Sequence, residues 1–242
     1  MASEPRIGRE HYDSSGYFEG QGVAHLTDPR SPFQRYRVAK LSELRTPRPS
    51  DRVVDLGCGW GTIGFAWAER VAAVVGVDFS ERSVELCRRR LADEPHSNLR
   101  FVCADAGDTG LEANAWDVVV AADLFEHLYP DDSARVAREA HRLLRPGGHF
   151  AVWTPNPGHV LEALRRHGIL LRPGPTHVDY KTMSSLRRLL SEAGFAIERA
   201  YHAESHVPGL RVAERLLQPV VPFLRRRIAV LGRKDPGTAQ GA

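Results

Sequence analysis

The sequence contains little cysteine and no long apolar run. Its three cysteines, Cys58, Cys87 and Cys103, are widely spaced and form no C-x-x-C pair, which argues against a disulfide framework or a cysteine-ligated zinc site. No stretch approaches the roughly 18 apolar residues that suggest a membrane-spanning helix, and the first residues lack the apolar segment of a secretory signal. We therefore expect a protein of the reducing cytoplasm.

The chain also carries little net charge. The formal net charge of +3 at pH 7 is too small to indicate nucleic-acid binding by itself. From Val207 onward there are seven basic residues against two acidic ones, and a solvated arginine-rich face is the simplest interpretation. With 42% hydrophobic residues among 242, the chain can bury a full core and is expected to form one domain with excursions.

Short apolar runs alternate with segments of helical periodicity, which is typical of repeated β-α-β units. The pattern predicts an α/β fold with a mostly parallel seven-stranded sheet and helices on both faces. The expected strands are 53–56, 74–78, 99–103, 118–122, 150–153 and, at one edge, 195–201 and 228–231. The expected helices are 33–44, 62–70, one capped by Ser80, one capped by Asp131 or Asp132 and stopped by Pro146-Gly147-Gly148, and one closed by Gly194.

A glycine-rich turn follows the first expected strand, in the segment Asp55-Leu56-Gly57-Cys58-Gly59-Trp60-Gly61. Glycine permits a sharp turn and the close approach of a ligand that a Cβ would obstruct. Asp78 ends the second strand, twenty-one residues after Gly57, and Asp105 follows the third. A carboxylate at Asp78 can accept hydrogen bonds from both hydroxyls of a ribose, and ligands of open α/β sheets bind outside the carboxyl ends of the strands. The three segments therefore predict one nucleotide-binding crevice.

In combination, these segments resemble the class I S-adenosylmethionine-dependent methyltransferases. Residues 53–61 resemble the first motif of that family, 77–80 its ribose-binding strand end and 103–106 its adenine-binding one, while 116–128 and 144–148 complete the usual order. The resemblance covers about residues 35–194 and implies a Rossmann-like methyltransferase fold that binds S-adenosylmethionine. The cofactor contacts that it implies are Arg37, Asp55, Gly57, Cys58, Gly59, Asp78, Phe79, Asp105, Ala106 and Asp123.

The resemblance also implies a role for each part of this set. It places the backbone of residues 57–59 beneath the methionine part, Asp78 on the ribose, Phe79 beside the adenine and Asp105 on its amino group. Arg35 and Arg37 stand where related enzymes often clamp the cofactor carboxylate, which suits an arginine fork, although an ordinary surface helix predicts the same residues. Residues 1–45 are expected to form an N-terminal helical lid, and 46–242 the cofactor-binding domain with acceptor-pocket insertions near 155–180 and 206–226.

A nicotinamide-dependent oxidoreductase is the alternative for the same turn, and a binding module without catalysis is a third. Dinucleotide-binding folds usually keep two residues before the third glycine, whereas this chain has the tighter G-x-G-x-G spacing. Asp55 would face a pyrophosphate unfavourably, yet it suits a sulfonium and an amino group. The sequence therefore favours methyl transfer.

Three residues are candidates for catalysis, namely Glu126 and His127 after the fourth strand and His177 in a segment rich in proline, glycine and histidine. Positioning supplies much of the rate of an in-line methyl transfer, and an oxygen or nitrogen acceptor must also lose a proton, for which histidine is the usual base. The Glu-His pair, with Thr176-His177 and Tyr180-Lys181, resembles the quinone-biosynthesis O-methyltransferases, which implies an aromatic or enolic hydroxyl as acceptor and His177 as base. Local packing predicts the same residues, and the sequence shows no complete metal ligand set.

The expected acceptor is a small molecule and not a nucleic acid. The chain has Asp123-Leu124-Phe125-Glu126 where base-amino methyltransferases carry an Asn/Asp-Pro-Pro-aromatic motif, and no cysteine follows a proline as in the cytosine-C5 enzymes. Oxygen is the favoured acceptor atom, with nitrogen and carbon as alternatives. Segments 161–171 and 210–224 mix leucine and arginine, and we expect them to line the acceptor pocket or pack on the sheet. Peripheral contact with an anionic membrane is the less favoured alternative, and the oligomeric state is not predicted.

Overall fold

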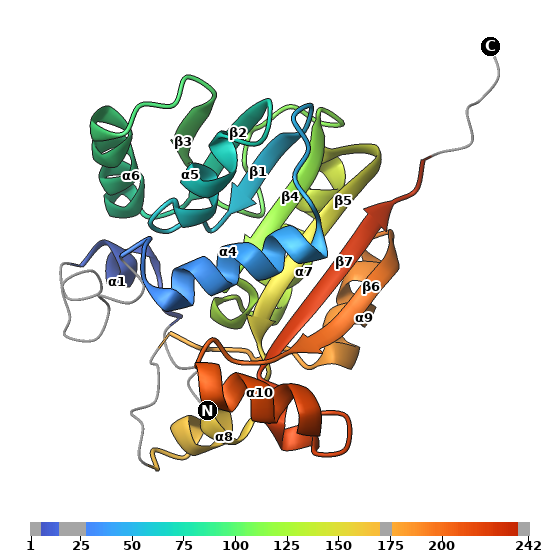
Figure 1. The fold of residues 1–242 in the computed structure, drawn as a ribbon. Helices are drawn as coiled ribbons and strands as arrows, with labels where there is room; N and C mark the ends of the chain where they lie inside the picture. The colour runs from blue at the N-terminus through green and yellow to red at the C-terminus, as the bar shows by residue number, and fades with distance from the viewer. Residues whose placement is uncertain (1–5, 15–27, 170–175, 237–242) are drawn as a thin grey trace.

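The computed structural model describes residues 6–14, 28–169 and 176–236 and contains one seven-stranded sheet (Figure 1). The strand order is β3-β2-β1-β4-β5-β7-β6. Neighbouring strands from β3 to β5 are parallel, whereas β7 runs antiparallel to both β5 and β6. The strands are β1 (Arg52–Leu56), β2 (Ala73–Asp78), β3 (Leu99–Cys103), β4 (Trp116–Ala122), β5 (Leu144–Pro155), β6 (Phe195–Ala203) and β7 (Arg227–Lys234). The mostly parallel seven-stranded sheet predicted from the sequence is confirmed.

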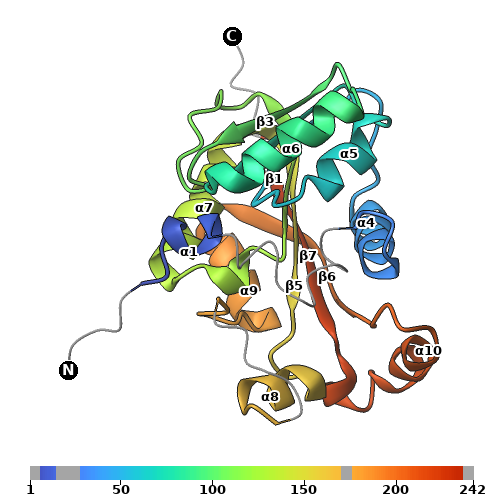
Figure 2. The same ribbon diagram turned by 90° about the vertical axis from the view of Figure 1, so that its left-hand side faces the viewer.

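Helices cover both faces of the sheet (Figure 2). One face packs against α4 (Pro32–Leu44), α5 (Thr62–Ala68) and α6 (Glu81–Asp93), and the other against α7 (Pro130–Leu143) and α9 (Met183–Glu192). Side chains alternate between the faces along each strand, so Val53 belongs to the first core and Val54 to the second. Both cores are apolar, which explains why the central strands read as continuous hydrophobic runs.

The observed helix ends agree with the signals read from the sequence, except at the two ends of α7. Ser80 caps α6 as predicted, because its hydroxyl accepts a hydrogen bond from the N–H of Ser83 at 3.2 Å. The predicted cap of α7 was wrong, since that helix begins at Pro130, whose fixed φ suits the first helical position, and the two acidic residues lie in its first turn. The predicted stop was also wrong, because α7 ends at Leu143 and the Pro-Gly-Gly segment lies inside β5.

Two short helices, α8 (Val160–Arg166) and α10 (Pro208–Leu217), both lie beyond the end of β5 (Figures 1 and 2). Nε2 of His159, just before α8, lies 3.2 Å from Oε1 of Glu214 in α10. Residues 170–175, including Arg172, and the side chains of Arg165 and Arg166 lie outside the part of the chain that is described. Leu216 and Leu217 of α10 are 72% and 46% exposed, so the expectation that the leucines of this segment pack on the sheet was wrong for these two, whereas Leu210 and Leu224 are partly buried. That the segment lines an acceptor pocket stays a prediction. None of the helices in the described residues is both long and apolar enough to span a membrane.

Candidate active site

The glycine-rich turn connects β1 to α5 through a backbone that glycine adopts most easily. Gly57, Gly59 and Gly61 have φ angles of +68°, +51° and +69°, in the left-handed region. A Cβ on Gly57 would lie 2.8 Å from Cδ1 of Leu124, whereas a Cβ on Gly59 would meet no described atom within 4 Å. Cys58 between them is buried in the core. The turn therefore packs closely on Leu124, which follows Asp123, and leaves open space at Gly59.

Asp78 ends β2 and is held against this turn. Its carboxylate accepts hydrogen bonds from the backbone N–H groups of Gly59 at 2.9 Å and Ser80 at 3.0 Å. Burial raises the pKa of Asp78, and the N–H groups oppose that rise because they stabilise the ionised form. The structure thus brings Asp78 directly beside the glycine-rich turn, as expected of neighbouring strand ends.

Asp55 lies beneath the turn. It is 1% exposed, and its Oδ2 atom has no hydrogen-bond partner among the described residues. Burial, partly opposed by Arg37 and reinforced by Asp78, raises the pKa of Asp55 to about 7. A cationic group beside this carboxylate would stabilise its ionised form. The site therefore fits a ligand that carries an amino group or a sulfonium, as S-adenosylmethionine does.

The residues expected around an adenine lie after β2 and β3. Phe79 packs edge-on against Tyr12 of α1 (Arg9–Asp13), with ring centroids 5.1 Å apart. Asp105 is largely exposed and accepts a hydrogen bond from Arg135 at 2.8 Å, while Ala106 beside it is partly buried. An adenine amino group would therefore share the Asp105 carboxylate with Arg135.

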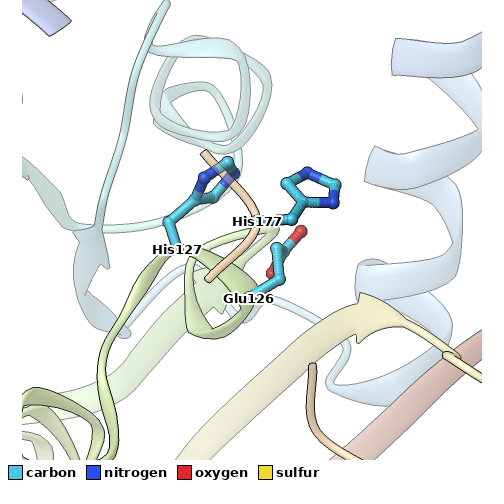
Figure 3. Close-up of side chains that lie close together, drawn as sticks. All are labelled: Glu126, His127 and His177. Carbon is cyan, nitrogen blue, oxygen red and sulfur yellow. The ribbon is translucent and has the colours of Figure 1, made fainter. Parts of the chain in front are cut away.

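Glu126, His127 and His177 form a side-chain cluster after β4 (Figure 3). One potential ligand atom of each lies within 4.8 Å of those of the other two. The backbone N–H groups of Val178 and Asp179 donate to the carbonyl oxygen of Glu126 at 2.9 and 3.3 Å. Main-chain hydrogen bonds therefore join the segment that carries His177 to the short 3-10 helix η1 (Phe125–His127) that carries the other two.

The Glu126 carboxyl group is protonated through much of the neutral pH range. It is 2% exposed and accepts a hydrogen bond from Oγ1 of Thr154 at 2.9 Å. Burial raises the pKa of Glu126 to about 8, and the charge of Asp123 contributes to the rise, while Arg227 opposes it. A carboxyl group in this state can donate as well as accept a hydrogen bond.

Both histidines of the cluster have their Nδ1 atom in a hydrogen bond. Nδ1 of His127 lies 3.0 Å from the carbonyl oxygen of Thr176, and since a carbonyl oxygen only accepts, Nδ1 carries the proton and Nε2 keeps a lone pair. Nδ1 of His177 lies 2.8 Å from the hydroxyl of Tyr180. Burial lowers the pKa of His127, so this imidazole is neutral at pH 7 and able to accept a proton.

The same cluster offers a ligand set for a divalent cation. Two imidazoles and one carboxylate are typical ligands of zinc and other first-row metals, and the three ligand atoms are mutually close. The sequence places only Glu126 and His127 side by side, and the fold brings His177 to them. The arrangement can therefore either move a proton or hold a metal ion.

Asp123 is bound between two arginines from opposite ends of the chain. Nη1 of Arg37 in α4 donates to Oδ2 at 3.2 Å, and Nη1 of Arg227 in β7 donates to Oδ1 at 2.5 Å.

The other arginines singled out in the sequence differ in their exposure, and Arg35 is exposed. Arg226 and Arg227, expected on a solvated face, are 15% and 12% exposed and have carboxylate partners. That expectation was wrong for these two residues because their partners come from segments distant in sequence.

Three residues of the site were not identified from the sequence. Tyr12 lies with its hydroxyl 3.5 Å from Nδ1 of His127, and nothing in its sequence context indicates a site. Arg227 belongs to a run of three arginines that reads as surface. Thr154 could have been found, because it lies near the carboxyl end of a predicted parallel strand, where the acidic candidates were sought.

Comparisons with known proteins agree with this geometry. Residues 53–148 match the family model described as a methyltransferase domain. The chain is 30% identical over 216 residues to the ubiquinone biosynthesis O-methyltransferase of Neisseria meningitidis, covering 86% of this chain and 85% of that protein. It is 36% identical over 146 residues to nocamycin O-methyltransferase of Saccharothrix syringae, covering 59% of this chain and about half, 49%, of that protein.

Solved structures show the same fold at lower identity. A phosphoethanolamine N-methyltransferase of Haemonchus contortus, in complex with S-adenosylmethionine, is 17% identical with a TM-score of 0.69, over 97% of this chain and 61% of that one. The YcgJ protein of Bacillus subtilis is 19% identical with a TM-score of 0.65, over 84% of this chain and all of that one. The glycine-rich turn allowed either S-adenosylmethionine or a nicotinamide dinucleotide as cofactor, and the sequence relatives favour S-adenosylmethionine. The chain belongs to the class I S-adenosylmethionine-dependent methyltransferases.

Proposed function

We propose that this methyltransferase acts on an oxygen atom of a small molecule, an aromatic or enolic hydroxyl such as secondary metabolites and quinone-like compounds carry. The single observation that carries the proposal is the cluster of Glu126, His127 and His177 after β4, because an oxygen acceptor must lose its proton during transfer. The names of the two sequence relatives, both O-methyltransferases, support the choice of oxygen. Nitrogen and carbon acceptors are the alternatives.

The cofactor supplies an electrophilic methyl group on a sulfonium when it is bound. In this proposal Asp78 holds the ribose, Phe79 and Ala106 flank the adenine, and Asp105 accepts its amino group. The open position at Gly59 and the unpaired Oδ2 atom of Asp55 support a ligand at the turn. Further contacts are proposed for Arg37, Gly57, Cys58 and Asp123.

His177 is the proposed base. Its Nδ1 atom is hydrogen-bonded to the hydroxyl of Tyr180, which in turn donates to Oε2 of Glu162 at 3.4 Å. This chain of hydrogen bonds puts the proton of the neutral His177 ring on Nδ1, so Nε2 carries the lone pair that accepts the proton of the acceptor hydroxyl in this proposal. Glu126 and His127 position the acceptor beside it, with Glu126 donating through its protonated carboxyl.

The N-terminal segment is proposed to act as a lid. Besides its contact with Phe79, α1 is linked to α6 because Oγ of Ser80 donates to the Asp13 carboxylate at 2.6 Å. Tyr12 lies between Phe79 and His127, so α1 spans from the proposed adenine site to the catalytic cluster. Residues 1–5 and 15–27 of the predicted lid lie outside the described part of the chain.

Calorimetric titration tests the cofactor assignment. S-adenosylmethionine and S-adenosylhomocysteine should bind the purified protein, and NAD should not. Asp78→Ala should weaken both adenosyl ligands, whereas Asp117→Ala, which changes a strand carboxylate that accepts from Arg145, should not. Unchanged affinity in Asp78→Ala would refute the assigned ribose contact.

Methyl transfer to a panel of phenols and enols tests the acceptor. The methylated atom is identified by NMR of the product, and His177→Ala should lower kcat more than it raises KM. A product methylated on nitrogen or carbon alone would contradict the proposal. Full activity of His177→Ala would remove that residue from the role of base.

A further inference from the structure

A hollow lies on the α4 side of the sheet, next to the residues described above. We call it the α4 cavity. Its walls come from α4, the end of β5, the connection after β6 and the start of β7. The empty space between its walls is about 240 Å³, which includes some volume open to the solvent. The room inside it is enough for about one water molecule. The residues that line it are Phe33, Tyr36, Arg37, Trp153, Glu204, Ser205, His206, Arg226 and Arg227.

Three of these side chains carry a buried polar atom that has no hydrogen-bond partner among the described residues. They are Nε1 of Trp153, Nε of Arg37 and Oγ of Ser205. Trp153 and Ser205 are only 1% and 4% exposed. Buried polar groups in folded proteins are nearly always hydrogen-bonded, so three unpartnered groups around one hollow indicate a ligand that accepts hydrogen bonds.

The chemistry of these groups restricts the ligand. An indole N–H and a guanidinium N–H only donate hydrogen bonds, and a serine hydroxyl can donate. A ligand group that only donates, such as an ammonium, would leave Trp153 and Arg37 unpartnered. An oxygen with lone pairs can accept a hydrogen bond from each of the three groups.

The charges around the α4 cavity favour an oxygen that is negative. Arg37 and Arg227 share a single carboxylate, that of Asp123, while Arg226 pairs with Glu162 at 3.4 Å. At Asp123, two guanidinium groups are therefore matched by one carboxylate.

Glu204 does not offset this excess. Its carboxylate is paired with Lys40, Arg211 and Arg215, the last at 2.6 Å. These cations, foremost Arg215, overcome burial and lower the pKa of Glu204 to about 2. The charge of Glu204 is thus taken up by cations that do not line the cavity.

The α4 cavity adjoins the reaction site through residues already described. Arg37 lines it and lowers the pKa of Asp55 beneath the glycine-rich turn. Arg227 lines it and opposes the raised pKa of Glu126 in the catalytic cluster. The N–H of Asp123 donates to the carbonyl oxygen of Trp153 at 2.7 Å. Two residues that line the cavity, Arg37 and Arg227, also hold the carboxylate of Asp123, three residues before Glu126, and we expect an acceptor at the cluster to reach the cavity.

We propose that the α4 cavity binds an anionic oxygen group of the methyl acceptor, received by Trp153, Ser205 and Arg37. The inference rests on the proposed function and narrows its substrate class to an acceptor that carries a second, negatively charged oxygen apart from the hydroxyl that is methylated. A carboxylate and an ionised enol share this chemistry. Because the hollow has room for only a water-sized group, we expect the oxygen to enter it while the body of the acceptor stays outside.

Binding to matched pairs of probes tests the proposal. The pairs are 3,4-dihydroxybenzoate with 3,4-dihydroxybenzamide, and 4-hydroxycoumarin with 4-methoxycoumarin, each titrated calorimetrically with and without S-adenosylhomocysteine. We expect the anionic member of at least one pair to bind about ten-fold more tightly than its neutral partner, because hydrogen bonds to charged groups are the stronger ones. A preference in the benzoate pair identifies a carboxylate, and one in the coumarin pair an enolate.

Substitutions test whether the preference for the anionic probe arises in the α4 cavity. Trp153→Phe keeps a ring and removes the N–H, and Ser205→Ala removes the hydroxyl with little change of volume, so each should reduce the preference several-fold. Trp116→Phe is the matched control, because the indole N–H of Trp116 donates to the carbonyl oxygen of Glu112 away from the cavity, and it should keep the preference. Thermal melting shows that each variant is folded.

Equal affinity for both members of both pairs would overturn the proposal, as would full preference in both Trp153→Phe and Ser205→Ala. The titration with S-adenosylhomocysteine alone tests the proposed function separately. A protein that binds the nucleoside and shows no preference for anions keeps its proposed function and loses this inference. A protein that prefers anions without binding the nucleoside loses the proposed cofactor contacts and keeps an anion site.

Discussion

Replacing Glu126 by glutamine should change how the stability of the protein depends on pH. In the folded protein Glu126 keeps its proton up to about pH 8, whereas a glutamate in an unfolded chain loses it near pH 4.3, roughly its value in model peptides. Folding therefore takes up a proton between these pH values, and the wild type loses stability as the pH rises. Glu126→Gln cannot ionise, yet its amide oxygen can still accept the hydrogen bond from Thr154.

The size of the effect follows from the two pKa values. Between pH 5 and pH 8 the wild type should lose roughly 3 kcal/mol of unfolding free energy that the variant retains. Urea unfolding followed by tryptophan fluorescence measures this difference at each pH. Glu198→Gln, which changes a partly exposed carboxylate near His149, serves as the control. A difference between wild type and Glu126→Gln that is the same at pH 5 and pH 8 would show that Glu126 is not protonated in the folded protein.

The structure predicts the effects of three further substitutions on stability and ligand binding. Gly57→Ala should destabilise the fold by about 1–3 kcal/mol and weaken S-adenosylhomocysteine binding, since its φ is +68° and the new Cβ would lie 2.8 Å from Leu124; unchanged melting and affinity would contradict the assigned turn. Ser80→Ala should cost about 1 kcal/mol in urea unfolding through the lost helix cap, and a loss below a few tenths would show that the cap is dispensable. Thr154→Val should destabilise the protein more at pH 8 than at pH 5, because the hydroxyl stabilises the ionised form of Glu126; an equal loss at both pH values in the same assay would refute this.

The arrangement of Asp78 beside the glycine-rich turn could be predicted from the sequence because its determinants are local. Asp55, Asp78 and Asp105 each stand at the end of a short apolar strand, and parallel strands bring their carboxyl ends to one edge. The glycine-rich turn likewise needs only its own backbone conformation. The two expected edge strands are confirmed as β6 and β7, but the sequence predicted neither the strand order nor the antiparallel direction of β7.

The rest of the site depends on contacts between distant segments. Arg227 finds Asp123 across 104 residues and Tyr12 reaches His127 across 115, and no local pattern marks such partners. The start of α7 was mispredicted for a different reason, because Pro130 and the acidic residues after it are both good signals for a helix start and only the packing of the chain selects between them.

The hydrogen bonds from Val178 and Asp179 to the carbonyl oxygen of Glu126 have an evolutionary consequence. Since these bonds use main-chain atoms, they hold His177 in register with the cluster whatever side chains surround them. Substitution of the side chains of Val178 and Asp179 therefore leaves these bonds intact, and His177, the proposed base, stays in place among descendants of this chain. In our proposal, the proton-accepting group can thus be inherited unaltered while the side chains next to it change.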